Sequence, residues 1–267
     1  MNQNKVLFGV MISLISFGIQ ADQTTQAPSS KPPGQTSKTA PPTTPASKNS
    51  DEKKGVTEMH SLEEFTSVVL SGVGTLHVKQ STEEGLTIEA PVKVLPNISV
   101  EVRGGTLYIS LNSGNAEVDE TQINYYLKIR NLQNVSTLSS ASISIEDGLS
   151  TETLNLTLNG FGDANINIKA RNLIARINGG GKIHAIGGAI NQQIIINGAG
   201  EFNGTKLIGK AGTIYINGAG DAKTNTSDSL AINITGDGMV GYCGAPQITK
   251  RISGKSSINP LGDSDCK

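Results

Sequence analysis

The sequence predicts an all-β protein, a parallel β-helix or β-solenoid with rungs of about 19 residues. Three observations predict this fold class: an Asn-Gly-x-Gly motif recurs at a nearly constant interval, apolar residues alternate before each copy, and another apolar residue follows each copy. The copies begin at Leu158, Ile177, Ile196, Ile216 and Ile234, so they are 19, 19, 20 and 18 residues apart. A short fixed period is typical of stacked repeats, in which each unit packs only on its neighbours.

The motif itself predicts the turn of each rung. Its glycines allow positive φ angles or close backbone approach between rungs, and its Asn side chains can hydrogen-bond from rung to rung as a ladder. We therefore expect a structural role for the turn residues, which are Asn159, Gly160, Gly162, Asn178, Gly179, Gly181, Asn197, Gly198, Gly200, Asn217, Gly218, Gly220, Gly236 and Gly238.

The residues on either side of each turn predict two strands per rung. Before the turn, apolar residues alternate with mostly polar ones, as in Leu156, Thr157 and Leu158. Such period-two alternation indicates a strand with one buried face. A second apolar column follows the turns, and its members are Ala164, Ile183, Phe202, Ala222 and Val240. We expect each strand to pair in parallel with its equivalents in the rungs above and below.

The N-terminal 56 residues predict two segments outside the fold. Residues 1–21 have the pattern of a secretory signal peptide, with Lys5 as the basic region and an apolar run over 6–19. The alternative interpretation is an uncleaved N-terminal anchor. No later stretch is apolar and long enough to span a bilayer, so we expect no transmembrane span in the mature chain. Residues 22–56 are rich in Pro, Thr, Ser and Lys, which predicts a disordered linker.

Three further segments complete the predicted organisation. Residues 57–135 alternate apolar and polar residues between Gly-containing turns, which indicates strand after strand without the 19-residue signature. This part is either a small sandwich or the first irregular coils of the solenoid, and the absence of an intervening linker favours the coils. Residues 136–245 hold the regular repeats, and residues 246–267 are expected to cap the stack.

Together these segments resemble a known family. The Ile-Asn-Gly-Ala-Gly units at 196–200 and 216–220, supported by Gly104-Gly105-Thr106-Leu107-Tyr108-Ile109, are similar to the bacterial head GIN domain of autotransporter-type adhesins. The resemblance covers residues 60 to 262. It implies a β-helical exported domain with a role in adhesion, and it brings no catalytic residues with it.

Charge and cysteine content narrow the classes of partner and site. The formal net charge is −1, from 22 Lys and Arg against 23 Asp and Glu, which argues against nucleic acid as a partner. Cys243 and Cys266 are an even number in an exported chain and permit one disulfide bond. His60, His77 and His184 show no metal-ligand spacing, and we expect His184 to be exposed and without a catalytic role. We expect no cofactor.

Charged residues follow several turns and predict a stacked column of Asp163, Lys182, Glu201 and Asp221. A solvated ladder of alternating charge would fix the register of the rungs. A weaker alternative is a calcium site between Glu201 and Asp221, although calcium-binding nonapeptide repeats have a much shorter period. A polysaccharide-active enzyme would instead use Asp163, Glu201 or Asp221 as acid or base, with Arg176 and Lys182 nearby.

These observations predict an exported, non-enzymatic β-solenoid that binds an unknown protein or glycan, either in the periplasm or at the cell surface. The predicted binding face consists of outward-pointing residues before the turns, namely Arg176, Ile195, Tyr215 and Asn233. One alternative is the polysaccharide-active β-helix enzyme. The other is a structural envelope protein, because open solenoid ends can pair edge to edge unless they are capped.

Overall fold

The structure of the protein is a computed structural model that describes residues 56–60, 62–112 and 122–266. The predicted signal peptide, residues 1–21, and the predicted linker up to residue 55 lie outside the described residues. Strand β1 begins at Val56, the residue with which the predicted linker ends. None of the described segments forms a helix of the length and hydropathy that crossing a bilayer requires.

The described chain consists of strands joined by short turns, with a short 3-10 helix, η2, at Leu95–Asn97. The N-terminal strands are β1 (Val56–His60), β2 (Ser67–Gly72), β3 (Thr75–Gln80), β4 (Gly85–Ala90), β5 (Ile98–Arg103), β6 (Thr106–Leu111), β7 (Asn124–Ile129) and β8 (Asn134–Ser139). The long strands are β9 (Ser142–Gly160), β10 (Asp163–Gly179), β11 (Lys182–Gly198), β12 (Glu201–Gly218) and β13 (Asp221–Gly236). The last strands are β14 (Met239–Cys243), β15 (Gln247–Ser253) and β16 (Ser257–Pro260).

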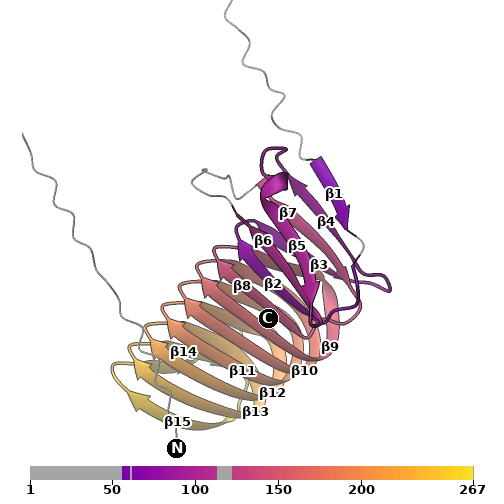
Figure 1. The fold of residues 1–267 in the computed structure, drawn as a ribbon. Helices are drawn as coiled ribbons and strands as arrows, with labels where there is room; N and C mark the ends of the chain where they lie inside the picture. Colours follow the sequence, from indigo (N-terminus) through magenta and orange to yellow (C-terminus); the bar gives the residue numbers. More distant parts are fainter. Residues whose placement is uncertain (1–55, 61, 113–121, 267) are drawn as a thin grey trace, which may run out of the picture. The chain divides into compact units, whose positions relative to one another are not determined.

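The long strands are successive rungs of a β-solenoid, as the repeated turn motif predicts. Each pairs in parallel with the next, and the pairing joins equivalent residues of the repeat. The register connects Leu158, Ile177, Ile196, Ile216 and Ile234 in turn. Figure 1 shows these rungs stacked in sequence order from β9 to β13. The predicted fold class and repeat length are therefore confirmed.

Each long strand bends and so contributes to both sides of the coil. In β9, Ser142–Ser144 pair with β3, whereas Asn155–Gly160 pair with β8. In β13, Asp221–Asn225 pair with β14 and Ser229–Thr235 pair with β15. We call the side that contains β3 and β14 the first side, and the side that contains β8 and β15 the second side.

The two apolar columns predicted from the sequence face each other inside the coil. Every member of both columns is buried: Leu158, Ile177, Ile196, Ile216 and Ile234 before the turns, and Ala164, Ile183, Phe202, Ala222 and Val240 after them. Burying a Leu, Ile or Phe side chain stabilises the folded state by about 1.5–3 kcal/mol relative to leaving it exposed. A single rung has no second layer to cover its apolar face, so this stabilisation arises only when rungs stack.

The rung spacing is least regular between β11 and β13, and a buried glutamine stabilises this region. The parallel register shifts between His184 and Ile186, and again after Asn203, so some backbone groups lose their ladder partners. Gln192, which is 2% exposed, donates hydrogen bonds from Nε2 to the carbonyl oxygens of Leu207 at 2.9 Å and Asn225 at 3.3 Å. Its Oε1 accepts from the hydroxyl of Thr224 at 2.8 Å. The side chain thus satisfies polar groups that water does not reach.

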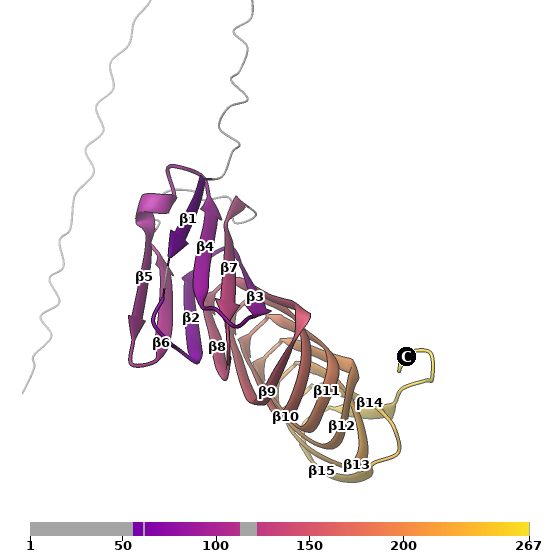
Figure 2. The ribbon, with the colours of Figure 1, turned by 90° about the vertical axis from the view of Figure 1, so that its right-hand side faces the viewer.

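The N-terminal strands are continuous with the repeats. On the first side, β3 pairs in parallel with β9 and β7, and β4 and β1 add antiparallel strands beyond β7. On the second side, β2 pairs in parallel with β8 and β6, and β5 is antiparallel to β6. Figure 2 shows β1, β4, β7 and β3 leading into the rungs along one side. Strand pairing therefore continues from these N-terminal strands into the rungs on both sides.

The C-terminal segment, expected to cap the stack, adds one further strand to each side. Strand β15 continues the second side and β16 continues the first side. Ile248 and Ile252 occupy inward-facing columns of β15 but are 37% and 40% exposed, because no described rung follows them. A disulfide bond joins Cys243 of β14 to Cys266, with 5.8 Å between their Cα atoms, and so fastens the tail to the last rung.

Candidate functional site

The asparagines of the repeated turn form a hydrogen-bonded ladder. Asn178 donates from Nδ2 to Oδ1 of Asn159 at 2.8 Å, and Asn197 and Asn217 each donate to the preceding Asn at 2.9 Å. Asn159 begins the ladder by donating to the carbonyl oxygen of Thr137 at 2.9 Å. Each inner Asn therefore uses its amide group to hold the rungs together, so the ladder is an element of the fold.

The two glycines of each turn meet different requirements. The first adopts a positive φ, for example 126° at Gly198 and 133° at Gly218, a conformation that L side chains rarely adopt. The second packs against the previous rung: a Cβ on Gly200 would lie 2.5 Å from Cγ2 of Ile177 and 2.9 Å from the carbonyl oxygen of Gly181. The first glycine thus meets a conformational requirement of the turn, and the second meets a steric one.

The predicted charged column also exists in the structure. Asp163, Lys182, Glu201 and Asp221 are paired one after another in the register of the first side. Nζ of Lys182 lies 4.0 Å from Oε2 of Glu201. Lys223 joins Glu201 and Asp221 in lining a surface hollow of about 260 Å³. Two lysines beside this pair of carboxylates favour a charge ladder over a calcium site. Within the described residues, no group of three or more His, Cys, Asp or Glu side chains is arranged to hold a metal ion.

The predicted binding face lies on the second side of the coil. The register places Arg176, Ile195, Tyr215 and Asn233 in one row across β10 to β13. Tyr215 is 38% exposed, and Ile195 beside it is partly exposed. These residues form a small apolar patch on a regular strand surface, and its use as a binding surface remains a prediction.

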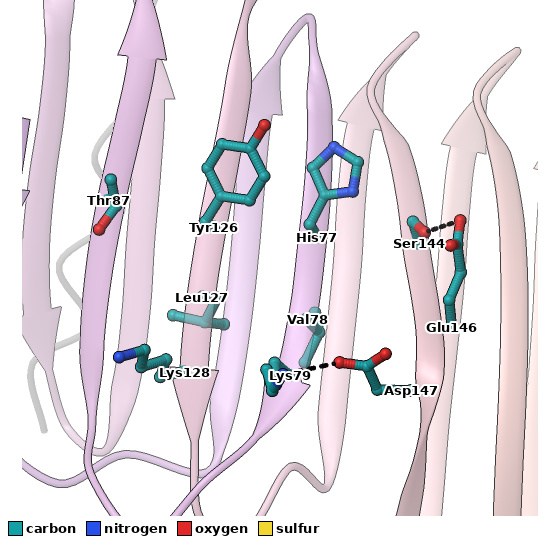
Figure 3. A pocket seen from close by; sticks show the side chains of 10 residues that line it. All are labelled: His77, Val78, Lys79, Thr87, Tyr126, Leu127, Lys128, Ser144, Glu146 and Asp147. Atoms are coloured by element: carbon teal, nitrogen blue, oxygen red, sulfur yellow. Dashed lines mark hydrogen bonds and ion pairs between the residues drawn. The ribbon is translucent and has the colours of Figure 1, made fainter. Parts of the chain in front are cut away.

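Elsewhere the structure forms a site that the sequence does not single out, a hollow of about 240 Å³ on the first side. One row of outward-facing residues crosses four neighbouring strands there. The row runs from Thr87 on β4 through Tyr126 on β7 and His77 on β3 to Ser144 on β9. The centroids of the Tyr126 and His77 rings lie 5.0 Å apart, with ring planes 15° from parallel. Figure 3 shows the two rings side by side, each seen face-on.

Hydrogen bonds hold this aromatic pair in place. The phenol of Tyr126 donates to Oε2 of Glu89 at 3.2 Å, and Nε2 of His77 lies 3.1 Å from Oδ1 of Asn124. Burial raises the pKa of the Tyr126 phenol above its usual range, and the hydrogen bond and negative charge of Glu89 raise it further. The phenol therefore stays protonated at neutral pH and remains a hydrogen-bond donor.

Charged side chains form the second row of the hollow. Lys79 and Lys128 are cross-strand neighbours on β3 and β7. Nζ of Lys79 pairs with Oδ2 of Asp147 at 3.0 Å, and the hydroxyl of Ser144 donates to Oε1 of Glu146 at 2.9 Å. The ion pairs of the described residues join Lys79, Arg171 and Lys182 to carboxylates, and none of them involves Lys128. The hollow is thus lined by carboxylates that already have partners within the chain, by hydroxyl groups, and by the ammonium group of Lys128, which has no carboxylate partner among the described residues.

The local sequence carries a weak signal for this hollow. His77 precedes Lys79 and Tyr126 precedes Lys128 by two residues, so period-two alternation places each pair on one strand face. The sequence does not show that β3 and β7 are neighbours. That pairing arises because the N-terminal coils return the chain to the first side after β6. The two aromatic-x-Lys segments form one site only because this path of the chain places β3 beside β7.

Comparison with known proteins places the fold in a family. The family described as "Putative auto-transporter adhesin, head GIN domain" matches residues 64–246. No curated protein sequence matches the chain. A solved "putative adhesin" from Bacteroides fragilis has a TM-score of 0.75 and 24% identity, and the match covers 78% of this chain and 98% of that one.

Two structures from Parabacteroides distasonis have the same fold. A "putative adhesin" has a TM-score of 0.64 and 19% identity, with 78% of this chain and 97% of that chain covered. A "putative lipid binding protein" has a TM-score of 0.65 and 21% identity, with 79% and 98% covered. At these identities the likeness concerns the fold alone. The family match spans most of the folded region and agrees with the repeated turn motif. The chain therefore belongs to the family described as "Putative auto-transporter adhesin, head GIN domain".

Proposed function

We propose that the chain is an exported, non-enzymatic binding module that acts as an adhesin or interaction protein of the cell envelope. The observation that carries this proposal is the hollow on the first side, where an exposed aromatic pair and charged side chains converge. Ligand sites are typically concave and combine apolar surface with a few placed polar groups. The binding partner is a protein or glycan of the cell surface or envelope.

Two features support export. Residues 1–21 have the sequence pattern of a signal peptide. Cys243 and Cys266 are joined in the structure, and disulfide bonds persist mainly in oxidising compartments outside the cytosol. Peptide mapping of the protein under non-reducing conditions tests this bond directly, and free thiols at both positions would remove the second argument.

The arrangement of the carboxylates supports a role without catalysis. Around the hollow, Glu89 accepts a hydrogen bond from Tyr126, Glu146 accepts one from Ser144, and Asp147 pairs with Lys79. In the charged column, Lys182 stands between Asp163 and Glu201 in the register. Glu89, Glu146, Asp147 and Glu201 each have a side-chain partner within the chain, whereas a general acid or base has to reach a substrate proton.

Attachment of cells tests the function, and protease accessibility tests the compartment. Cells that produce the full chain are compared with cells in which residues 57–266 are deleted, for attachment to host cells and to envelope fragments. Intact cells are then treated with protease while a periplasmic protein serves as the control. Loss of the domain with survival of the control places it on the surface, whereas protection until the outer membrane is broken places it in the periplasm. Equal attachment by both strains, with no envelope partner recovered, would contradict the proposal.

Two variants decide which face binds. Tyr126→Ala alters the hollow on the first side, and Tyr215→Glu alters the predicted binding face on the second side. These tyrosines are similarly exposed, at 42% and 38%, so each variant controls for the other. If the hollow binds the partner, Tyr126→Ala reduces attachment and Tyr215→Glu leaves it unchanged. The reverse result would assign binding to the face formed by Arg176, Ile195, Tyr215 and Asn233.

A further inference from the structure

The stacked rings of Tyr126 and His77, which we call the platform, form a partly exposed aromatic surface with a polar border. Tyr126 and His77 lie on adjacent strands with nearly parallel rings, and the residues on both sides of them, Thr87 and Ser144, are small. Small neighbours leave room beside the rings for a ligand. The inward neighbours Leu127 and Val78 are buried, so the strands that carry the rings are anchored in the core. A rigid platform of this kind suits a ligand ring that has one apolar face.

The polar side chains around the platform favour a ligand with many hydrogen-bonding groups. Thr87 supplies a hydroxyl group, Glu146 and Asp147 supply acceptors, and Lys128 supplies a donor. A sugar ring in the pyranose form matches both requirements, because its C–H face is apolar and its edge carries hydroxyl groups that donate and accept.

The charges around the platform disfavour a polyanion. A nucleic acid also has rings that stack, but its phosphates require a groove dominated by Lys and Arg. Here Glu89, Glu146 and Asp147 surround the rings, and Lys79 is already paired with Asp147. Among the described residues that line the hollow, Lys128 is thus the lysine left to pair with a ligand. The hollow therefore has the means to neutralise one carboxylate per ligand segment, but not a row of phosphates.

Lys128 also marks the point where the hollow meets a second one. The adjoining hollow, of about 340 Å³, is lined by His60, Glu83, Glu84, Gly85, Leu86, Thr87 and Lys128. Thr87 and Lys128 belong to both hollows. A ligand that fills both must extend along β4 and β7 and pass Lys128 on its way, which favours a chain of sugar units over a single sugar.

We infer that the two hollows form one binding site for an oligosaccharide that carries a carboxylate on at least one of its sugar units. One sugar ring lies on the Tyr126 and His77 platform, its carboxylate pairs with Lys128, and the next unit occupies the hollow beside Glu84. This inference rests on the proposed binding function and names the ligand class of that same site.

Isothermal titration of the purified chain with defined oligosaccharides tests the inference. The probes are tetrasaccharides that each contain a single uronate unit (galacturonate, mannuronate or glucuronate) among neutral sugar units, and each is compared with its methyl ester, which keeps the sugar rings and removes the charge. We expect at least one free acid to bind at least about tenfold more tightly than its ester, since only the free acid can form an ion pair with the ammonium group of Lys128. Absence of binding by all three free acids at millimolar concentration would overturn the ligand class.

Matched variants locate the binding. Lys128→Gln should remove the preference for the acid over the ester while binding of the ester persists, and Lys210→Gln, which changes an exposed lysine of β12, should have no effect. Tyr126→Ala should abolish binding of both forms, whereas Tyr215→Ala should not. Unfolding curves of each variant show that the domain is intact. An unaltered acid preference in Lys128→Gln would overturn the assignment of the carboxylate to this lysine.

The cell attachment assay separates a failure of this inference from a failure of the proposed function. If no saccharide binds but Tyr126→Ala still reduces attachment, the ligand is of another class, such as a protein, and the binding function stands. If deletion of the domain changes neither attachment nor envelope partners, the binding function itself is wrong.

Discussion

The side chains of Asn178 and Asn197 are hydrogen-bonded across two rungs, with Nδ2 of Asn197 donating to Oδ1 of Asn178 at 2.9 Å. Asn178 in turn donates to Asn159 at 2.8 Å, so its amide group uses a donor and an acceptor at once. The ladder therefore couples three successive turns through side chains, in addition to the backbone pairing of their strands.

Replacing Asn178 by Ala should lower the free energy of unfolding by about 1–2 kcal/mol, because both neighbours in the ladder lose a hydrogen-bond partner and water replaces it only in part. Urea unfolding followed by circular dichroism measures this loss. Asn233→Ala is the matched control, since Asn233 points outward from β13 and the described residues give its side chain no hydrogen bond. An equal loss in both variants would show that the ladder adds nothing specific.

Gly200→Ala should destabilise the protein by about 1–3 kcal/mol, because the added methyl group overpacks the core and forces the backbone or side chains to move. Its Cβ would lie 2.5 Å from Cγ2 of Ile177. Gly188 provides the control, since a Cβ there would find its nearest neighbour, the carbonyl oxygen of Ile208, at 3.7 Å. Gly188→Ala should change stability by less than about 0.5 kcal/mol or increase it slightly. The measurement is the thermal unfolding midpoint of each variant. Equal midpoints for the two variants would contradict the conclusion that Gly200 is needed for close packing against Ile177.

Gln192→Leu should lower the free energy of unfolding by about 2 kcal/mol or more. The substitution leaves buried hydrogen-bonding groups without a partner, and each such group costs roughly 1–3 kcal/mol. The groups that lose a partner are the carbonyl oxygens of Leu207 and Asn225 and the hydroxyl of Thr224. The same substitution at Gln193, which points outward, serves as the control for the change in hydrophobicity. Chemical denaturation of both variants is the measurement. If Gln192→Leu is as stable as the natural chain, the buried network does not contribute as inferred.

Alkaline pH should destabilise the protein through Tyr125. Burial raises the pKa of this phenol from 10.0 to about 12 in the folded state. Because the folded pKa lies above the unfolded one, the stabilisation is fully present below pH 10 and is lost as the pH rises from 10 to about 12. The loss amounts to about 3 kcal/mol at 1.36 kcal/mol for each pKa unit. Unfolding free energies at pH 9 and pH 11.5 should differ less in Tyr125→Phe than in the natural chain, and an identical pH dependence in the two proteins would contradict this origin.

The sequence by itself determined the repeated architecture. The interval between Asn159, Asn178, Asn197 and Asn217 predicts the rung length, and alternation before each Asn predicts the inward-facing columns, because every rung meets the same steric and packing requirements. The ladder of asparagines and the two roles of the glycines follow from the same local periodicity. The resemblance of these units to the head GIN domain likewise needed only the motif, and the family match agrees with it.

The tertiary structure alone decided the site. His77 and Tyr126 are 49 residues apart in the sequence and have no shared period, yet they are paired in the register of β3 and β7. The return of the irregular N-terminal coils to the first side brings them together, and local propensity does not encode that return. Gln192 is a similar case, since only the shifted register around it explains a buried glutamine. Periodic contacts are repeated in the sequence and can be recognised there, whereas contacts made once depend on the path of the whole chain.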